Sequence, residues 1–212
     1  MRWVNLNTWK RKRHFEMFKS MDFPHFNICA DVDVTQTIHF CKHRNISSSM
    51  YMIYLISRSA NEIENFRYRI RDEKVCLHDR VDPAFTVLND DELYYHCTVK
   101  YESDFERFEP LAIRQINISK NEKRLQDSKG RDDVLHMSCI PWLKFSGISH
   151  AIHFTPIDSI PRFYWGKYEN QMGKIIMPVS VQVHHGLADG LHVAKLFELL
   201  QQYLNSPGEI IV

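Results

Sequence analysis

The chain lacks the sequence features of membrane-spanning, disulfide-stapled, zinc-binding and repeat proteins. No apolar run approaches the ~18 residues that a membrane-spanning helix requires, and the N-terminal segment MRWVNLNTWKRKRHF contains no apolar core like that of a signal peptide. The 5 cysteines are odd in number and form no CxxC pair, so neither a disulfide framework nor a metal site is favoured. No low-complexity tract or solenoid-length repeat occurs. We therefore expect a compact cytoplasmic protein without a metal.

A strong charge of either sign is also missing. Lys and Arg number 27 and Asp and Glu number 26, which gives a formal net charge of +1. Nothing in this balance favours nucleic acid or a membrane surface as a partner. The 212 residues include 44% hydrophobic ones, enough for one well-packed core, and no Pro/Gly/Ser-rich linker interrupts them. We expect residues 1–212 to form a single domain.

The most informative stretch is residues 175–203, IIMPVSVQVHHGLADGLHVAKLFELLQQY. Its first nine residues alternate between apolar odd positions and mostly polar even positions, which is typical of a half-buried strand. After Gly190 the apolar residues recur at helical spacing and predict an amphipathic helix. His184 and His185 therefore lie where a strand ends, a position from which a rigid element can direct an imidazole at a ligand.

Two interpretations of this pair stay open when it is read alone. An imidazole titrates near neutral pH, so one histidine is suited to take a proton from a hydroxyl and return it, with Asp189 orienting it or holding the loop. In the other interpretation one histidine caps the strand, and Asp189 begins the helix, where its charge suits the positive end of the helix dipole.

Further motifs, in a fixed order, make the pattern specific. Together with HHGLADG they are WKRKRHF at 9–15, RYRIRD at 67–72, VDPAFTV at 81–87, SCIPW at 138–142 and GKY at 166–168. In their order and spacing they resemble the chloramphenicol acetyltransferase family, and they cover most of the chain. The resemblance implies transfer of an acetyl group from acetyl-CoA, the co-substrate, to a hydroxyl of a small acceptor. Chloramphenicol is the best single choice of acceptor.

The resemblance also implies roles for individual residues. His185 matches the general base, which requires one ring nitrogen free of hydrogen while the other donates to a backbone carbonyl. Ser138 matches the serine whose hydroxyl stabilises the oxyanion of a tetrahedral intermediate. Asp189 matches an aspartate that pairs with an arginine, here Arg11, and supports the loop. His184 is expected to point to the opposite side, because side chains alternate at a strand end.

Other family properties follow in the same way. No acyl-enzyme forms, because both substrates meet in one ternary complex. The functional unit is expected to be a homotrimer with each active site between two subunits, and the aromatic content of 12% is compatible with such interfaces.

This sequence departs from the family at residues expected to line the acceptor pocket. Phe18 stands where chloramphenicol enzymes have a tyrosine, Tyr164 where the family has a threonine that holds a water, and His136 where some members have an asparagine. Phe26 is a further pocket candidate. The residues for acetyl transfer are kept and those for the acceptor differ, so the reaction is better supported than the substrate.

Periodicity predicts a mixture of helices and strands without regular βαβ alternation. Helices are expected at 9–19, 49–66 and 104–126 and after Gly190, and strands at 26–34, 75–78, 85–87, 93–99, 134–138 and 175–183. Serines 47–49 offer N-cap oxygens, and Pro141-Trp142 is expected to be buried. The fold class predicted is an α+β two-layer sandwich with a mixed β-sheet, which is also what the resemblance implies, the CoA-dependent acyltransferase fold.

Three alternatives share some of these features. Catalytic domains of dihydrolipoamide acyltransferases have the same fold, but a lipoyl domain and linker are expected upstream of the Trp9 motif. Condensation domains of peptide synthetases use a similar motif in about twice this length. A non-catalytic relative that binds a small molecule remains the third alternative, although the presence of His185, Ser138, Asp189 and Arg11 together favours an enzyme.

Overall fold

The computed structural model describes residues 1–123 and 130–210 and is built around one mixed β-sheet. The order in this sheet is β2-β10-β8-β7-β5-β6, with β9 pairing β10 beside this path. The bounds are β2 His25–Asp33, β5 Asp82–Leu88, β6 Tyr94–Thr98, β7 Val134–Ile140, β8 Arg162–Gly166, β9 Glu169–Gln171 and β10 Lys174–His184. The pairs β5–β7 and β7–β8 are parallel and the others antiparallel, so the predicted mixed sheet is confirmed.

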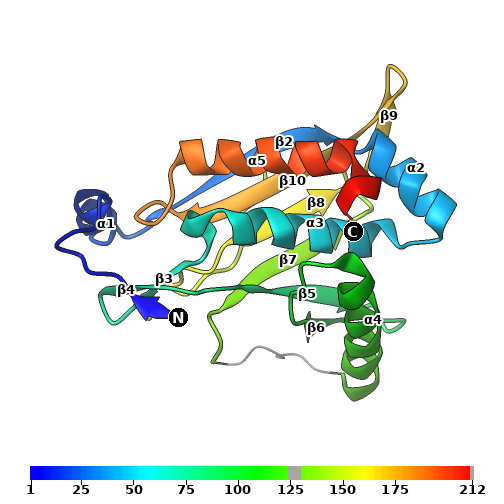
Figure 1. Cartoon of the computed structure of the whole chain (residues 1–212). Coiled ribbons are helices and arrows are strands. Elements are labelled where there is room, and N and C mark those ends of the chain that lie inside the picture. The colour runs from blue at the N-terminus through cyan, green and yellow to red at the C-terminus, as the bar shows by residue number, and fades with distance from the viewer. Residues whose placement is uncertain (124–129, 211–212) are drawn as a thin grey trace.

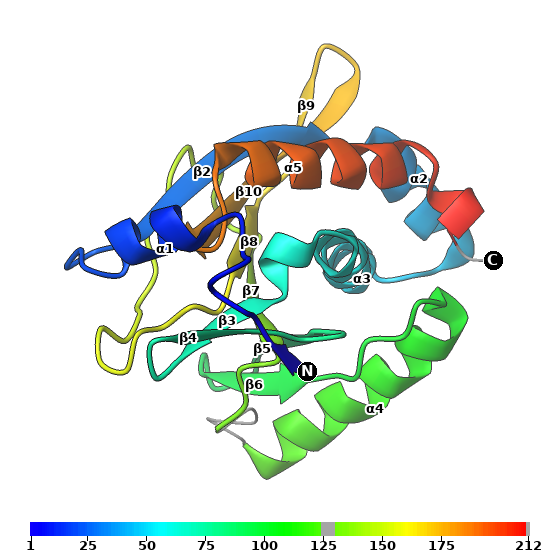
Figure 2. The same ribbon diagram turned by 60° about the vertical axis from the view of Figure 1, so that its left-hand side comes forward.

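Helices α2 to α5 cover one face of this sheet (Figure 1). The helices are α1 Lys12–Phe18, α2 Thr35–Arg44, α3 Ser48–Glu62, α4 Phe105–Glu122 and α5 Gly190–Asn205, with short 3-10 helices η1 Glu64–Phe66 and η2 Pro207–Ile210. Figure 2 shows α3 lying between α5 and α4. The two-layer α+β class is confirmed. No helix within residues 1–123 or 130–210 has the length and hydropathy needed to cross a bilayer.

A smaller sheet lies beside the first helix. Its strands are β1 Arg2–Trp3, β4 Lys74–Leu77 and β3 Tyr68–Arg71, in that order. A second apolar cluster packs here around the fully buried Phe15 of α1, with Leu187 from the loop after β10. This packing fixes α1 at the end of the main sheet where β10 finishes, opposite the turn that carries β9 (Figure 1).

Alternation along β10 divides its side chains between two environments. Val179, Val181 and Val183 belong to the main core under the helices. The residues between them, Ser180 and Gln182, point to the opposite face and are also buried. The main sheet therefore has one apolar face, which holds the fold together, and one polar face, which is available for chemistry.

The predicted boundaries differ from the observed ones for identifiable reasons. The helix expected at 9–19 begins only at Lys12. Ser47 is the N-cap of α3, its hydroxyl accepting from the Met50 N–H, but the helix expected to reach residue 66 ends at Glu62 because Ile63 adopts extended dihedrals. For the helix expected at 104–126, the structure has Phe105–Glu122, and residues 124–126 lie outside the described residues.

The expectation that Pro141 and Trp142 are buried is wrong, since both are exposed. The Trp142 side chain is 64% exposed, and the neighbouring Leu143 is 63% exposed. Both residues follow the end of β7, and no layer of the described structure covers this turn. Sequence reasoning also gave no strand at 162–166 and no helix at 35–44.

The close packing around Gly166, at the end of β8, can be tested by adding a side chain there. A Cβ placed there would lie 2.7 Å from the Leu143 carbonyl oxygen and 2.9 Å from both the Phe145 ring and Pro178. Such overpacking costs about 2 kcal/mol of stability, so we expect Gly166→Ala to lower the free energy of unfolding by about this amount. Gly147→Ala is the matched control, since nothing lies within 4 Å of its added Cβ. Equal denaturant midpoints for the two variants would contradict the packing described.

Candidate active site

The two adjacent histidines point in different directions, as expected from strand alternation. His184 is 2% exposed, its ring contacts that of His25, and its Nδ1 accepts a hydrogen bond of 3.1 Å from the Gly186 N–H. Burial lowers the pKa of His184 to about 3, which keeps the ring neutral. His184 therefore has a structural place in the strand end, as predicted.

Two aromatic rings contact the partly exposed imidazole of His185. The Phe18 ring stacks on the imidazole with 3.9 Å between centroids, and Phe26 lies at 4.6 Å. The side chain is 35% exposed, yet its Nδ1 is buried. A reacting molecule can therefore reach the ring only from its other atoms, which include Nε2.

The Nδ1 atom differs from the expectation. The resemblance implied a hydrogen bond from this nitrogen to a backbone carbonyl, but Nδ1 has no hydrogen-bond partner among the described residues. It lies 3.4 Å from the Asp189 Oδ1 instead. An Nδ1–H would gain from the negative charge of this carboxylate.

Arg11 and Asp189 form the ion pair that was expected. The guanidinium binds both carboxylate oxygens, with Nη1–Oδ2 at 2.5 Å and Nη2–Oδ1 at 2.8 Å. The same group also donates to the carbonyl oxygens of His185 at 3.1 Å and Gly186 at 3.4 Å. The Arg11 guanidinium lowers the pKa of the Asp189 carboxyl. Arg11, at the start of α1, therefore holds both the Asp189 carboxylate and the backbone of the loop that carries His185.

The loop after β10 is tied at both of its ends. The His185 N–H donates to the Pro24 carbonyl at 2.8 Å, and the Asp189 N–H donates to Nδ1 of His192 in the first turn of α5 at 2.9 Å. Between them Gly186 leaves no room for a side chain, since a Cβ would lie 3.0 Å from the His184 ring. The backbone that carries His185 is thus fixed on several sides.

Ser138 lies in the middle of the polar face, on β7. Its Oγ is 2.7 Å from the Oγ1 of Thr86 on β5. Tyr164 is its cross-strand neighbour on β8, and the ring of His150 stacks on that phenol ring with 3.8 Å between centroids. Burial raises the pKa of Tyr164, so its hydroxyl stays protonated.

His136 lies two residues before Ser138 on the same face and pairs in register with Arg162. Burial, together with the nearby Arg162, lowers the pKa of His136 to about 4. The ring is thus neutral at pH 7 and offers one donor and one acceptor. Arg162 itself is paired with Asp158 at 2.5 Å.

The predicted site residues fall into two groups that one chain does not bring together. His185 lies with Phe18, Phe26, Arg11 and Asp189, and Ser138 lies with His136 and Tyr164. Ser138, Tyr164 and Ser180 lie in one row across the sheet. His185 is five residues beyond Ser180 and two strands away from Ser138, a separation on the order of 19 Å. Either group alone is half of the expected site.

Comparison with known proteins shows the family of the chain. The family model described as chloramphenicol acetyltransferase matches residues 1–201. The chain belongs to the chloramphenicol acetyltransferase family. The relative named chloramphenicol acetyltransferase 3 from Escherichia coli is 28% identical over 210 residues, covering 95% of this chain and 96% of the relative. A chloramphenicol acetyltransferase from Klebsiella sp is 29% identical over 204 residues, covering 94% and 92%.

Solved structures agree on the fold. A chloramphenicol acetyltransferase superposes with a TM-score of 0.84 at 24% identity, covering 95% of this chain and 98% of the other. The cubic core of the pyruvate dehydrogenase multienzyme complex superposes with a TM-score of 0.71 at 14% identity, covering 93% and 88%. The family and fold predicted from the sequence motifs are confirmed, and with them the enzyme class, an O-acetyltransferase.

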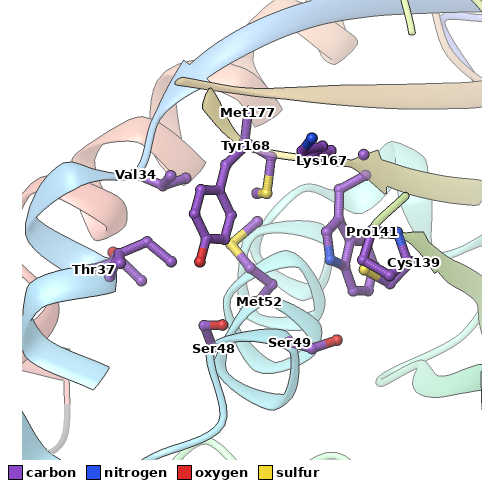
Figure 3. A pocket seen from close by; sticks show the side chains of 13 residues that line it. Val34, Thr37, Ser48, Ser49, Met52, Cys139, Pro141, Lys167, Tyr168 and Met177 are labelled. Carbon is purple, nitrogen blue, oxygen red and sulfur yellow. The ribbon is translucent and has the colours of Figure 1, made fainter. Parts of the chain in front are cut away.

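A cavity opens beside the Ser138 strand of this acetyltransferase, on the other face of the sheet (Figure 3). Its volume is about 550 Å³ including the open mouth. The lining residues are Val34, Thr37, Ile38, Ser48, Ser49, Met52, Cys139, Pro141, Trp165, Gly166, Lys167, Tyr168 and Met177. Figure 3 shows the Tyr168 ring reaching toward Met52, with Cys139 and Pro141 on another side. The GKY motif thus lies at a mainly apolar hollow with one ammonium group.

One group of side chains in the described residues has donors close enough for a metal. Ligand atoms of Cys76, His78 and Asp132 lie within 4.8 Å of one another. The Asp132 carboxylate is already held by Arg71, whose Nε is 2.6 Å from Oδ2, and His78 Nε2 is 3.0 Å from Oδ1. A divalent cation bound to Asp132 would have to displace the Arg71 guanidinium or lie next to its positive charge. We therefore interpret Cys76, His78 and Asp132 as part of an ion-pair network with Arg71.

Thr86 was missed by sequence reasoning. It lies in the strand predicted at 85–87 and in the VDPAFTV motif, but neither pattern assigned a role to its hydroxyl. Only the register between β5 and β7 brings it beside Ser138.

The Arg11–Asp189 pair predicts a measurable effect in this acetyltransferase. Removing the charge in Asp189→Asn leaves Arg11 facing a neutral amide, and we expect a loss of about 2 kcal/mol in the free energy of unfolding together with lower activity. Glu16→Gln is the control, since its ion pair with Lys12 is exposed and 3.8 Å long.

The same pair predicts a pH dependence of the difference between wild type and Asp189→Asn. Because Arg11 lowers the pKa of Asp189 in the folded state, the stabilisation is complete above the carboxyl's ordinary pKa and is lost as the pH falls through the lowered one. Denaturant titrations at pH 7, 5 and 3 should give a difference that is constant at first and smaller at pH 3. A difference that grew toward pH 3 would contradict this account.

Proposed function

We propose that this chain transfers the acetyl group of acetyl-CoA to a hydroxyl of a small acceptor, with chloramphenicol the best single choice. The observation that carries the proposal is the presentation of His185. Its ring is stacked on Phe18 and contacts the tilted Phe26 ring, its Nδ1 is buried, and its loop is held by Arg11. The relatives that match over nearly the whole chain are named for chloramphenicol acetylation.

His185 acts as the general base in this proposal. Its Nε2 takes the proton of the acceptor hydroxyl while that oxygen forms a bond to the thioester carbonyl carbon. The electron pair of the C=O bond moves to the oxygen and gives a tetrahedral oxyanion. When this intermediate collapses the C–S bond breaks, and the departing CoA sulfur takes the proton from His185. The products are an acetyl ester and free CoA thiol, and the imidazole is neutral again.

Ser138 stabilises the oxyanion by donating its hydroxyl hydrogen. Its position on the polar face, in the middle of the sheet, gives that donor a rigid support. A single well-placed donor of this kind contributes ~3 kcal/mol to transition-state stabilisation. Asp189 and Arg11 do not touch the reacting atoms and serve to hold the loop that carries the base.

Acetyl-CoA fits the cavity beside β7. Its apolar lining suits the methylene-rich arm of the thioester, and Lys167 supplies a positive charge for a phosphate. Cys139 lines this cavity, and Ser138 is the preceding residue of the same strand, with its side chain on the opposite face of the sheet. The location is a proposal supported by shape and charge.

The site is completed between two copies of the chain, and the family resemblance makes the assembly a homotrimer. The separation of His185 from Ser138, on the order of 19 Å, supports this arrangement because no proton or oxyanion contact spans it. Two large exposed apolar side chains, Phe23 beside His25 at 54% exposure and the adjoining Phe154 at 60% exposure, are suited to an interface.

A different hydroxylated acceptor is the alternative substrate. The observation that favours it is the bulk beside Ser138, where Tyr164 is stacked against His150 and His136 is a neutral hydrogen-bonding ring. A misfit methylene group in an apolar pocket costs ~1–3 kcal/mol, whereas a missing hydrogen bond to the acceptor costs more. Acetylation of chloramphenicol is therefore expected to be detectable and weaker than that of the best acceptor.

The test is release of CoA thiol from acetyl-CoA with chloramphenicol and with a panel of other alcohols. We expect His185→Ala to lower turnover by several orders of magnitude while acetyl-CoA binding is kept, since only the proton acceptor is lost. His184→Asn, which alters the neighbouring structural imidazole, is the comparison and should lose stability rather than chemistry.

The outcomes separate the possibilities. Near-normal turnover of His185→Ala would contradict the mechanism. Product from another alcohol but none from chloramphenicol would keep the reaction and refute the substrate. Binding of acetyl-CoA or acceptors with no transfer to any alcohol would favour the non-catalytic relative.

A further inference from the structure

We infer that Thr86 is a positioning residue for Ser138, donating a hydrogen bond that directs the serine hydroxyl toward the reacting carbonyl. The inference rests on the proposed function and extends it to a side chain of the VDPAFTV motif to which the resemblance assigned no role. The observation behind it is the 2.7 Å separation between Thr86 Oγ1 and Ser138 Oγ.

The sheet register explains why the two hydroxyls meet. Strands β5 and β7 are parallel neighbours, with Ala84 opposite His136 and Phe85 opposite Met137. The next pair in this register is Thr86 and Ser138, so both side chains leave the same face at the same level. Phe85 and Met137 point the other way, into the main core, which holds the two backbones together.

The direction of the hydrogen bond follows from the chemistry. A serine hydroxyl has one hydrogen and two acceptor lone pairs. If Ser138 donated to Thr86, its hydrogen would point along the sheet and away from an oxyanion. Ser138 can serve the oxyanion only if it accepts from Thr86. The productive arrangement is a directed pair, in which Thr86 donates to Ser138 and Ser138 donates to the substrate.

Threonine is better suited than serine to the supporting position. Its β-branched side chain restricts χ1, whereas the unbranched serine side chain can occupy all three staggered χ1 rotamers. The backbone of β5 is paired on both sides, by β6 and β7, so Thr86 is a fixed reference. Accepting this bond also polarises the Ser138 O–H and makes it a stronger donor.

The opposing interpretation is that Thr86 is an ordinary strand residue whose hydroxyl merely satisfies that of Ser138. Thr is common in strands, and a cross-strand pair of hydroxyls contributes to sheet stability. Both interpretations predict some loss of stability on substitution. They differ in whether the effect on turnover depends on Ser138.

The test uses Thr86→Val, which keeps the shape and removes the hydroxyl, and Thr86→Ser, which keeps the hydroxyl. We expect Thr86→Val to lower kcat about five- to tenfold with both KM values within about twofold of wild type. Thr86→Ser should recover most of the loss. If Thr86→Val melts well below wild type, Thr86→Ala carries the same comparison.

The decisive step is to repeat the substitution in a Ser138→Ala background. A residue that acts through Ser138 has nothing left to orient there, so Thr86→Val should change kcat less than about twofold. Ser180→Ala is the matched control, since this hydroxyl lies on the same face and bonds to Asn27. It should leave kcat unchanged.

Each outcome bears on a different claim. An equal loss in both backgrounds, a loss confined to KM, or no loss in active wild-type enzyme would overturn the role of Thr86 and leave the proposed function intact. A wild-type chain that transferred acetyl to no hydroxylated acceptor would overturn the proposed function, and this inference with it.

Discussion

The candidate active site depends on one guanidinium. Arg11 comes from the first helix and binds a carboxylate and two carbonyl oxygens of the loop that follows β10. The α1 helix is itself fixed by Phe15, which is fully buried against the smaller sheet. Packing at the N-terminal end of the chain is thereby coupled to the position of an imidazole near its C-terminal end. A mobile loop would present His185 in many orientations, whereas this one presents it in one.

The second constraint is the strict alternation of strand side chains. It gives the sheet an apolar face under the helices and a polar face that carries Ser138, and it sends His184 and His185 in opposite directions. The same geometry places the proposed base beyond the end of β10 and the proposed oxyanion donor in the middle of β7. A rigid sheet does not fold back to join them, and this separation supports the proposal that two copies of the chain share each site.

Sequence reasoning reached the residues that motifs mark and missed those that only register joins. The alternation before His184 predicted β10, and family membership confirmed the enzyme class. The Arg11–Asp189 contact spans 178 positions, and only the resemblance indicated it. Thr86 and Ser138 meet through a parallel pairing that local patterns do not encode. Helix α2, TQTIHFCKHR, is too polar to show a clear apolar face, so its sequence did not predict a helix. The apolar side chain of Trp142 suggested burial, but no other part of the described structure packs over the turn after β7.

The central proposal is that each site takes His185 from one subunit and Ser138 from another. Mixing two variants that are each nearly inactive tests it most directly. His185→Ala and Ser138→Ala chains, each of low activity alone, would be unfolded together and refolded. Random mixing in a cyclic trimer gives about one quarter of the sites both intact residues, so activity should rise to about that fraction of wild type. Activity no greater than the average of the separate variants would contradict the shared site.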